Sequence, residues 1–320
     1  MKISREQILI LVNLSANDKK AESKWLHIRD EVFSVLGGKV RVVEYRPPFD
    51  LELCLEEIMA DLDIKFIISA GGDGSLNYLV NHLMTLPVSQ RMKFTVGAIG
   101  LGSSNDALKP FHKFIQGVPV NIDYNSSALV DIGKVVMDSN TQEQFYFLNN
   151  ISFGVTANAN ALFNKSDFIL KMIKRRFTNL AIIYSALKTI VHHQNIQSVL
   201  KFNNKIIESN LSTLSILKTP FLAGILRYDQ DIQRNDGFLG VNLCDGMTRM
   251  QLIKTVYALS KTRFSARKKC LSFLAKDIEV HFNDKVNIEI DGEIQRGQAF
   301  KISLAPKCLN YISSPQKTQL

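Results

Sequence analysis

Strand-like and helix-like segments alternate strictly through the N-terminal third of this 320-residue chain. Short apolar runs at residues 8–12, 39–45, 64–70 and 93–100 are typical of strands, and stretches at 18–36, 50–62 and 74–84 have helical periodicity. Such alternation favours parallel strands joined by helices that cover both faces of the sheet. We therefore expect an N-terminal three-layer α/β domain around a mostly parallel sheet.

The pattern changes near residue 130, where short β-rich segments are separated by Asn, Asp and Gly. This is typical of a β-sandwich or a large antiparallel sheet, here interrupted by one helical insertion at residues 166–193. We place the domain boundary near residue 128, which gives domains at 1–128 and 129–305. The segment from about residue 306 to 320 is expected to pack back on the first domain, with its last residues, 313–320, loosely attached.

The composition is that of a globular chain, because 46% of the residues are hydrophobic and 22% are charged. No apolar run approaches the ~20 residues needed to span a bilayer. The run at 8–12 is short and reads as a strand, not as a signal peptide. The four cysteines show neither CxxC nor disulfide-like spacing, which favours a reducing compartment and no zinc site.

The formal net charge is +9, which favours a polyanionic partner such as a membrane surface, a phosphorylated substrate or nucleic acid. Basic residues gather at 171–176 and 261–269, with apolar or aromatic residues among them as in an interfacial helix or loop. Each run alone is more typical of a solvated helix face, but together they favour an anionic membrane surface. No recognition-helix or RRM-type motif is present, so we expect no nucleic acid partner.

Three glycines surround Asp73 in the sequence AGGDGSLN at residues 70–77, directly after an apolar strand. Glycine lets the backbone approach a phosphate closely, and a helix that starts here offers free N–H groups and its positive dipole end. Asp73 would repel a phosphate, so we expect it to act on Mg²⁺ through water. The alternative is a tight strand-to-helix turn with a capping aspartate.

Similar polar loops follow two other predicted strands. The strand at 93–100 leads into GSSND at residues 102–106, which we expect to precede a helix, and the strand at 8–12 leads into NLSAN at residues 13–17. The carboxyl ends of parallel strands form the ligand-binding edge of such a sheet. Turn chemistry alone does not account for three such loops, so we predict a phosphate-binding site at this edge.

A set of motifs occurs in order along almost the whole chain: VNLSAN (12–17), GGDGSLN (71–77), GLGSSNDALKPF (100–111), LVDIGKV (129–135), FLNNISFGVTA (147–157), RNDGFLGVNL (234–243) and IEIDGE (288–293). The set resembles the motifs of the diacylglycerol kinase catalytic-domain family of lipid kinases, which includes bacterial lipid kinases and the sphingosine and ceramide kinases. The glycine motif alone is shared with NAD kinases and phosphofructokinases. The ordered set, with a terminal D-G-E, is much more specific.

The resemblance implies a role for particular residues of this chain. It implies that ATP contacts Asn13, Asn17, Gly71, Gly72, Asp73, Gly74, Ser75, Asn77, Ser103 and Asn105. It implies a catalytic Mg²⁺ organised through water by Asp73, Asp106 and Asp131. The general base would be Asp291 or Glu293, and the residues leave this choice open.

The resemblance also implies a structural Mg²⁺ at Asp236 and the backbone carbonyls of Leu239 and Val241, although Gly240 stands where many members have Asp. Other departures lie near the nucleotide loops. Leu14 replaces the usual Pro, Asn17 the usual Gly, Ser104 a small Gly or Ala, and Tyr78 a frequent Glu. Leu14 and Asn17 suggest that the first nucleotide loop has a different shape.

The expected function is therefore that of an ATP- and Mg²⁺-dependent lipid kinase that phosphorylates a hydroxyl of a membrane lipid such as diacylglycerol. We expect a cytoplasmic protein that binds the inner membrane face peripherally, with Lys171, Lys174, Arg175, Arg176 and the run 261–269 as contacts. A homodimer is left open. One alternative is an NAD kinase-like enzyme, and another is a catalytically weak nucleotide- or lipid-binding regulator.

Overall fold

The computed structural model describes residues 8–37, 40–46, 55, 64–138, 140–165, 170, 173 and 178–313. The chain divides into two compact units, Met1–Val130 with Lys307–Leu320, and Asp131–Pro306. Nearly all of the expected helix at 50–62, the basic residues of the 171–176 run and the tail from 314 lie outside the described residues.

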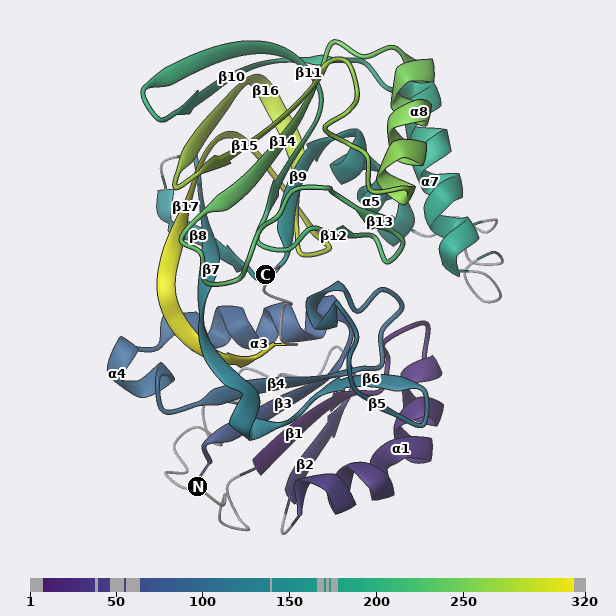
Figure 1. The fold of residues 1–320 in the computed structure, drawn as a ribbon, viewed down its shortest axis with the longest axis vertical. Helices are drawn as coiled ribbons and strands as arrows, with labels where there is room; N and C mark the ends of the chain where they lie inside the picture. The colour runs from purple at the N-terminus through teal and green to yellow at the C-terminus, as the bar shows by residue number, and fades with distance from the viewer. Residues whose placement is uncertain are drawn as a thin grey trace. The chain divides into compact units, whose positions relative to one another are not determined.

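The first unit is built on strands β1 (Ile8–Asn13), β2 (Val40–Tyr45), β3 (Phe66–Gly71) and β4 (Thr95–Gly100). They lie side by side in the order β4-β3-β1-β2, and each neighbouring pair is parallel (Figure 1). Strands β1, β3 and β4 are almost wholly buried, as their continuous apolar sequences predict. Gly71 pairs with Gly100, so β3 and β4 end at the same level of the sheet.

Helices α1 (Lys20–Leu36) and α3 (Asp73–Thr85) pack against β1 and β3, and the short α4 (Val88–Arg91) follows α3. Trp25, Ile28 and Val32 form part of the buried face of α1. The loop after β4 leads into a single 3-10 turn, η1 (Asp106–Leu108), where the sequence predicted a helix. Pro110 explains the difference, because proline disfavours helical backbone in the residue before it.

The first unit is completed by β5 (Phe114–Ile115), β6 (Val118–Asn121) and η2 (Tyr124–Ser126), and by the end of the last strand, β17 (Glu293–Ile312). Strand β6 pairs antiparallel with β4 at Ala98 and Ile99. The end of β17 pairs parallel with β4, through Asn310 and Tyr311. The Tyr311 hydroxyl donates to the Ala107 carbonyl oxygen at 3.2 Å, so the end of β17 supports η1.

The second unit is strand-rich, and its strand pairs are antiparallel. Strands β15 (Cys270–Ala275), β14 (Leu239–Asp245), β11 (Lys205–Leu217), β10 (Ile196–Phe202), β16 (Ile278–Ile290) and β17 are neighbours in that order. Strand β9 (Asn150–Gly154) pairs with both β11 and β16, β7 (Ser127–Met137) pairs with β8 (Asn140–Phe147), and β12 (Phe221–Leu222) pairs with β13 (Leu226–Arg227). The rings of Phe153, Phe282 and Phe300 contact one another in its core.

Three helices lie together beside these strands: α5 (Val155–Lys165), α7 (Thr178–His192) and α8 (Arg249–Ser260) (Figure 1). Helical structure begins at Val155, earlier than the predicted 166, because Gly154 takes a φ of 71° and ends β9. Helix α8 was not predicted, although its Thr248–Gln251 capping box was a readable signal. Within the described part of the chain, no helix has the length and apolarity required to cross a membrane.

The end of β17 brings the chain back to the first unit, and a substitution at the buried Tyr311 tests how much this segment stabilises that unit. Tyr311→Ala removes a fully buried aromatic ring and its hydrogen bond to Ala107, so we expect a loss of roughly 3–5 kcal/mol in the free energy of unfolding. The measurement is urea unfolding followed by the fluorescence of Trp25, the single tryptophan of the chain, which is buried in the same unit.

The matched control is Val88→Ala in the same unit, at a side chain that is 59% exposed. It should change the free energy of unfolding by no more than about 0.5 kcal/mol. Equal urea midpoints for Tyr311→Ala and the control would show that the end of β17 does not stabilise the first unit.

Candidate functional site

The loops that follow β3 and β4 are in direct backbone contact. The N–H groups of Leu101 and Gly102 both donate to the carbonyl oxygen of Gly71, at 2.8 and 3.0 Å. A Cβ atom on Gly102 would overlap the Cα of Gly72. Glycine is therefore required at this contact because the two chains approach too closely for any side chain.

The side chain of Asp73 links the loop after β4 to the start of α3. Its carboxylate accepts the backbone N–H of Asp106 at 3.1 Å and that of Ala107 at 2.9 Å, so it caps η1. The carboxylate of Asp106 lies 2.7 Å from the ammonium of Lys109, and both side chains are largely buried. The structure thus brings Asp73 and Asp106 together at the carboxyl ends of β3 and β4.

The loop after β1 is also hydrogen-bonded to the start of α3. The side-chain amide of Asn13 donates to the Ser75 hydroxyl at 3.0 Å, and its oxygen accepts the N–H of Ser15 at 3.0 Å. Ser75 also forms a hydrogen bond with Tyr45 that lowers the pKa of the phenol, but burial of the ring has the larger effect and raises it. Polar side chains of three strand-end regions therefore lie within one hydrogen-bonded network.

Two departures in the first loop have structural reasons. Leu14 donates its backbone N–H to the Tyr45 carbonyl oxygen at 3.0 Å, which a proline could not do, and its side chain is buried. Asn17 has a φ of 54°, a left-handed conformation that Asn tolerates better than most residues. The chain therefore forms this loop without the usual Pro and Gly.

Helix α3 starts at Asp73 without a side-chain cap on Gly72, so its first turn presents backbone N–H groups at the glycine loop. Ser103 is exposed on the neighbouring loop. The side chains of Asn77 and Asn105 are buried and make local hydrogen bonds: Asn77 accepts from Asn81, and Asn105 donates to the carbonyl oxygens of Gly100 and Gly102. Their hydrogen bonds help to hold the two loops in shape, and their contact with ATP stays a prediction.

The D-G-E sequence lies in a tight turn of the second unit, between β16 and β17. The Asp291 carboxylate accepts three backbone N–H groups, those of Leu148, Asn149 and Asn150, at 2.7 to 2.9 Å. Glu293 is exposed at the start of β17. Asp291 therefore fixes the start of β9 to this turn, and Glu293 is the more accessible of the two carboxylates.

The expected structural metal site contains an amine instead. The Nζ atom of Lys218 lies 3.0 Å from the Asp236 carboxylate and 3.4 Å from that of Asp131. Leu239 and Val241 lie within β14, where Val241 pairs with β11 on one side and β15 on the other. These donors do not fit a divalent ion. Nor do the described residues contain a cluster of three or more His, Cys, Asp or Glu side chains that could hold a metal.

Sequence reasoning missed Lys218 and Lys109. Lys218 follows the apolar run of β11, where a charged residue has to be buried with a partner, and this was the available signal. Lys109 lies three residues after Asp106, a spacing that suits an ion pair within a helical turn. Both lysines pair with carboxylates that the sequence assigned to Mg²⁺.

Both units match models of known protein families. The profile of the diacylglycerol kinase catalytic domain matches residues 7–138, and that of the YegS C-terminal NAD kinase beta sandwich-like domain matches residues 149–313. A diacylglycerol kinase of Staphylococcus carnosus is 23% identical over 234 residues, which cover 72% of this chain and 71% of that protein. One of Bacillus subtilis is 21% identical over 235 residues, 72% of each chain.

The same architecture occurs in a solved structure. The crystal structure of a diacylglycerol kinase from Bacillus anthracis (strain Sterne) superposes with a TM-score of 0.73 at 18% identity, over 97% of both chains. The fold is therefore that of a catalytic N-terminal domain followed by a C-terminal β-sandwich domain.

The close approach of the two glycine loops can be tested directly. Gly102→Ala places a methyl group against Gly72, so the loops must separate and the hydrogen bonds to Gly71 must lengthen. We expect faster amide hydrogen exchange at Leu101 and Gly102 and a loss of about 1–3 kcal/mol in stability. Ser103→Ala, at the adjacent exposed residue, should leave both unchanged. Wild-type exchange in Gly102→Ala would contradict the contact.

Proposed function

The chain belongs to the diacylglycerol kinase family, and on that premise we propose that it transfers the terminal phosphoryl group of ATP to a hydroxyl of a membrane lipid such as diacylglycerol. The observation that carries the proposal is the meeting of polar strand-end loops at the uncapped start of α3. The expected three-layer arrangement is part of this proposal and is supported by α1 on β1 and α3 on β3.

The phosphates of ATP would lie at the start of α3. The backbone at Gly72 to Gly74 and the helix dipole favour negative charge there. At Gly72 and Gly102 the two loops carry no side chain that would keep a phosphate away from the backbone. Asn13, Asn17 and the exposed Ser103 are the side chains we assign to further nucleotide contacts.

The donor chemistry at this edge suits Mg²⁺ bound through water. The Asp73 carboxylate is already committed to two backbone N–H groups, and that of Asp106 to Lys109, so both would meet the ion through its water shell. With Asp131 they are the residues that would organise it, and the bound ion would neutralise charge on the phosphates.

The base that accepts the proton of the lipid hydroxyl would come from the turn Asp291–Glu293. This turn is rigid, because Glu289 accepts the N–H of Gly292 at 2.6 Å and Asn164 donates to the Gly292 carbonyl oxygen at 2.9 Å. A fixed carboxylate is what proton abstraction requires. We keep both Asp291 and Glu293 as candidates, with Asp291 the better positioned and Glu293 the more exposed.

Helices α7 and α8 form the surface that we propose for contact with an anionic membrane. They pack against each other, and each exposes large apolar side chains at helical spacing: Leu180, Ile183, Leu187 and Val191 on α7, and Met250, Ile253 and Tyr257 on α8. Neither helix contains an Asp or Glu. Lys188 and Lys261 lie over the rings of Tyr184 and Tyr257. An apolar face on two helices that carry lysines and no carboxylate suits an anionic lipid surface.

The function is tested by incubating the purified protein with γ-labelled ATP, Mg²⁺ and a panel of membrane lipids, and then extracting the lipids. We expect label in the organic phase, with one class of hydroxyl lipid preferred. Asp73→Ala should reduce transfer by roughly 100-fold or more, because it removes the carboxylate that positions η1 and faces the ion.

Each other outcome of this assay contradicts the proposal in a defined way. Label on NAD instead of lipid would favour an NAD kinase-like enzyme. ATP binding without transfer to any acceptor would favour a nucleotide-binding regulator. Full activity in a folded Asp73→Ala protein would remove Asp73 from the site.

The membrane surface is tested by vesicle sedimentation with phosphatidylglycerol-containing and neutral vesicles. The double variant Leu187→Gln and Tyr257→Ser should weaken binding to anionic vesicles about tenfold, since it removes exposed apolar area without burying a polar group. Ile206→Gln is the control, because Ile206 is 67% exposed on β11. Unchanged vesicle binding would contradict the proposed membrane surface. If the sedimentation coefficient of the free protein changed at the same time, the surface would be a self-association face.

A further inference from the structure

Lys218 is a fully buried ammonium in the second unit, with 0% exposure of its side chain. It follows the last residue of β11 at a position where the chain leaves the core. A buried ammonium is stable only when oxygen atoms surround it, because transfer of an unpaired charge from water is very costly. The oxygen atoms around Lys218 therefore show what kind of ion this part of the structure accommodates.

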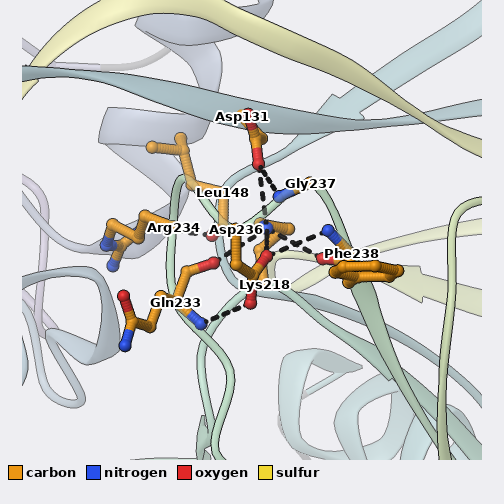
Figure 2. A network of polar contacts seen from close by, with 8 residues as sticks. All are labelled: Asp131, Leu148, Lys218, Gln233, Arg234, Asp236, Gly237 and Phe238. Carbon is orange, nitrogen blue, oxygen red and sulfur yellow. Dashed lines mark hydrogen bonds and ion pairs between the residues drawn. The ribbon is translucent and has the colours of Figure 1, made fainter.

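Four oxygen atoms surround the Nζ atom (Figure 2). Two belong to the carboxylates of Asp131 at 3.4 Å and Asp236 at 3.0 Å. The other two are the backbone carbonyl oxygens of Gln233 at 2.9 Å and Phe238 at 2.8 Å. An ammonium group only donates, so it suits a site lined by oxygen acceptors alone.

The segment 233–238 is wound around this ammonium. Its N–H groups bind the same carboxylates: Gly237 donates to Asp131 at 2.8 Å, and Gln233 and Phe238 donate to Asp236 at 2.8 and 2.9 Å. Its carbonyl groups at both ends point to the Nζ atom, as Figure 2 shows. Carboxylates combined with loop carbonyls are the oxygen ligands that a protein offers to a hard cation.

The expected divalent ion has no place in this loop. The Nζ atom lies 3.0 Å from the Asp236 carboxylate, and a Mg²⁺ ion would need the same oxygen at about 2.0–2.1 Å beside a second positive charge. The acidic residue usual at position 240 is absent, and a Cβ on Gly240 would meet the side-chain oxygen of Gln230, which would have to move. The chain thus lacks this aspartate and has a buried lysine in the same region.

We propose that the ammonium of Lys218 replaces the structural divalent cation of this fold, so that the loop 233–238 is held by a cation that belongs to the chain. One ammonium and two carboxylates leave a single net negative charge, which the three N–H donors of the loop offset. The second unit then keeps its loop in place without any metal. This proposal does not depend on the proposed function.

Lys218 also connects the loop to the D-G-E turn. Its backbone N–H donates to the Asn149 carbonyl oxygen at 2.7 Å, and the N–H of Asn149 binds Asp291. On the other side, Arg234 donates to the Leu148 carbonyl oxygen at 3.1 Å and accepts the N–H of Asp131 through its own carbonyl at 2.7 Å. Lys218 is therefore a positioning residue for both Asp131 and Asp291.

The test uses the full-length protein without nucleotide. Wild-type protein treated with EDTA and desalted should keep its melting temperature to within about 1 °C, with or without millimolar Mg²⁺ or Mn²⁺. Mass-spectrometric metal analysis should find no stoichiometric divalent ion. Lys218→Met keeps the volume but leaves the buried carboxylate of Asp131 and the partly exposed one of Asp236 without their cation, so its melting temperature should fall by roughly 10 °C.

Lys218→Ala opens space for a replacement cation. Its melting temperature should also fall, and millimolar Mn²⁺ or methylammonium should restore several degrees in this variant and none in wild type or Lys218→Met. Lys201→Ala, at an exposed lysine on β10, removes the same charge and should change the melting temperature by no more than about 1–2 °C.

Three results would overturn the proposal. They are a chelator-induced loss of stability in wild type that divalent metal reverses, a stoichiometric bound divalent ion, or wild-type stability in Lys218→Met. The first two are measured on wild type alone, so they remain decisive even where a Lys218 variant fails to fold.

Discussion

The carboxylate of Asp73 joins the two strand-end loops on which the proposed nucleotide site depends. It lies in the first turn of α3 and accepts two N–H groups from η1, while the backbones of Gly72 and Gly102 touch beneath it. The hydrogen bonds of Asp73 and the close contact between Gly72 and Gly102 depend on each other. Without glycine at 102 the loops could not approach, and without Asp73 the N–H groups of the second loop would lack their acceptor.

Ammonium groups pair with two of the three aspartates that the family resemblance assigns to the catalytic Mg²⁺, and with Asp236, which it assigns to the structural ion. Lys109 pairs with Asp106, and Lys218 lies between Asp131 and Asp236. Such pairs lower the net negative charge that carboxylates would otherwise carry, and they fix the side chains in one geometry. In the second unit Lys218 has a further contact, because its backbone N–H binds Asn149, whose own N–H binds the Asp291 carboxylate. The chain thus uses its own cations to order acidic residues before any ligand arrives.

Much of the fold and family could be predicted, because the apolar runs became β1, β3 and β4 and the D-G-E motif became a real turn. These strands and this turn are determined by residues that are close together in the sequence. The features that the sequence did not predict depend mostly on contacts between residues that are far apart in it. The η1 turn replaced a predicted helix because of Pro110, and the metal loop became an ion pair because Lys218 is buried. The apolar run before Lys218 signals a buried charge, but the distant residues that pair with it cannot be read from a single sequence. The same holds for Cys244 and Cys270, whose spacing suggested no relation but whose sulfur atoms lie 3.8 Å apart.

The central claim is that the loops after β3 and β4 form one phosphate site. Amide hydrogen exchange measured by mass spectrometry, with and without MgATP, tests it most directly. The account predicts that residues 71–75 and 100–107 gain protection together, at the same nucleotide concentration, because Asp73 and the glycine contact couple them. Protection confined to one of these segments, or found only elsewhere in the chain, would contradict it.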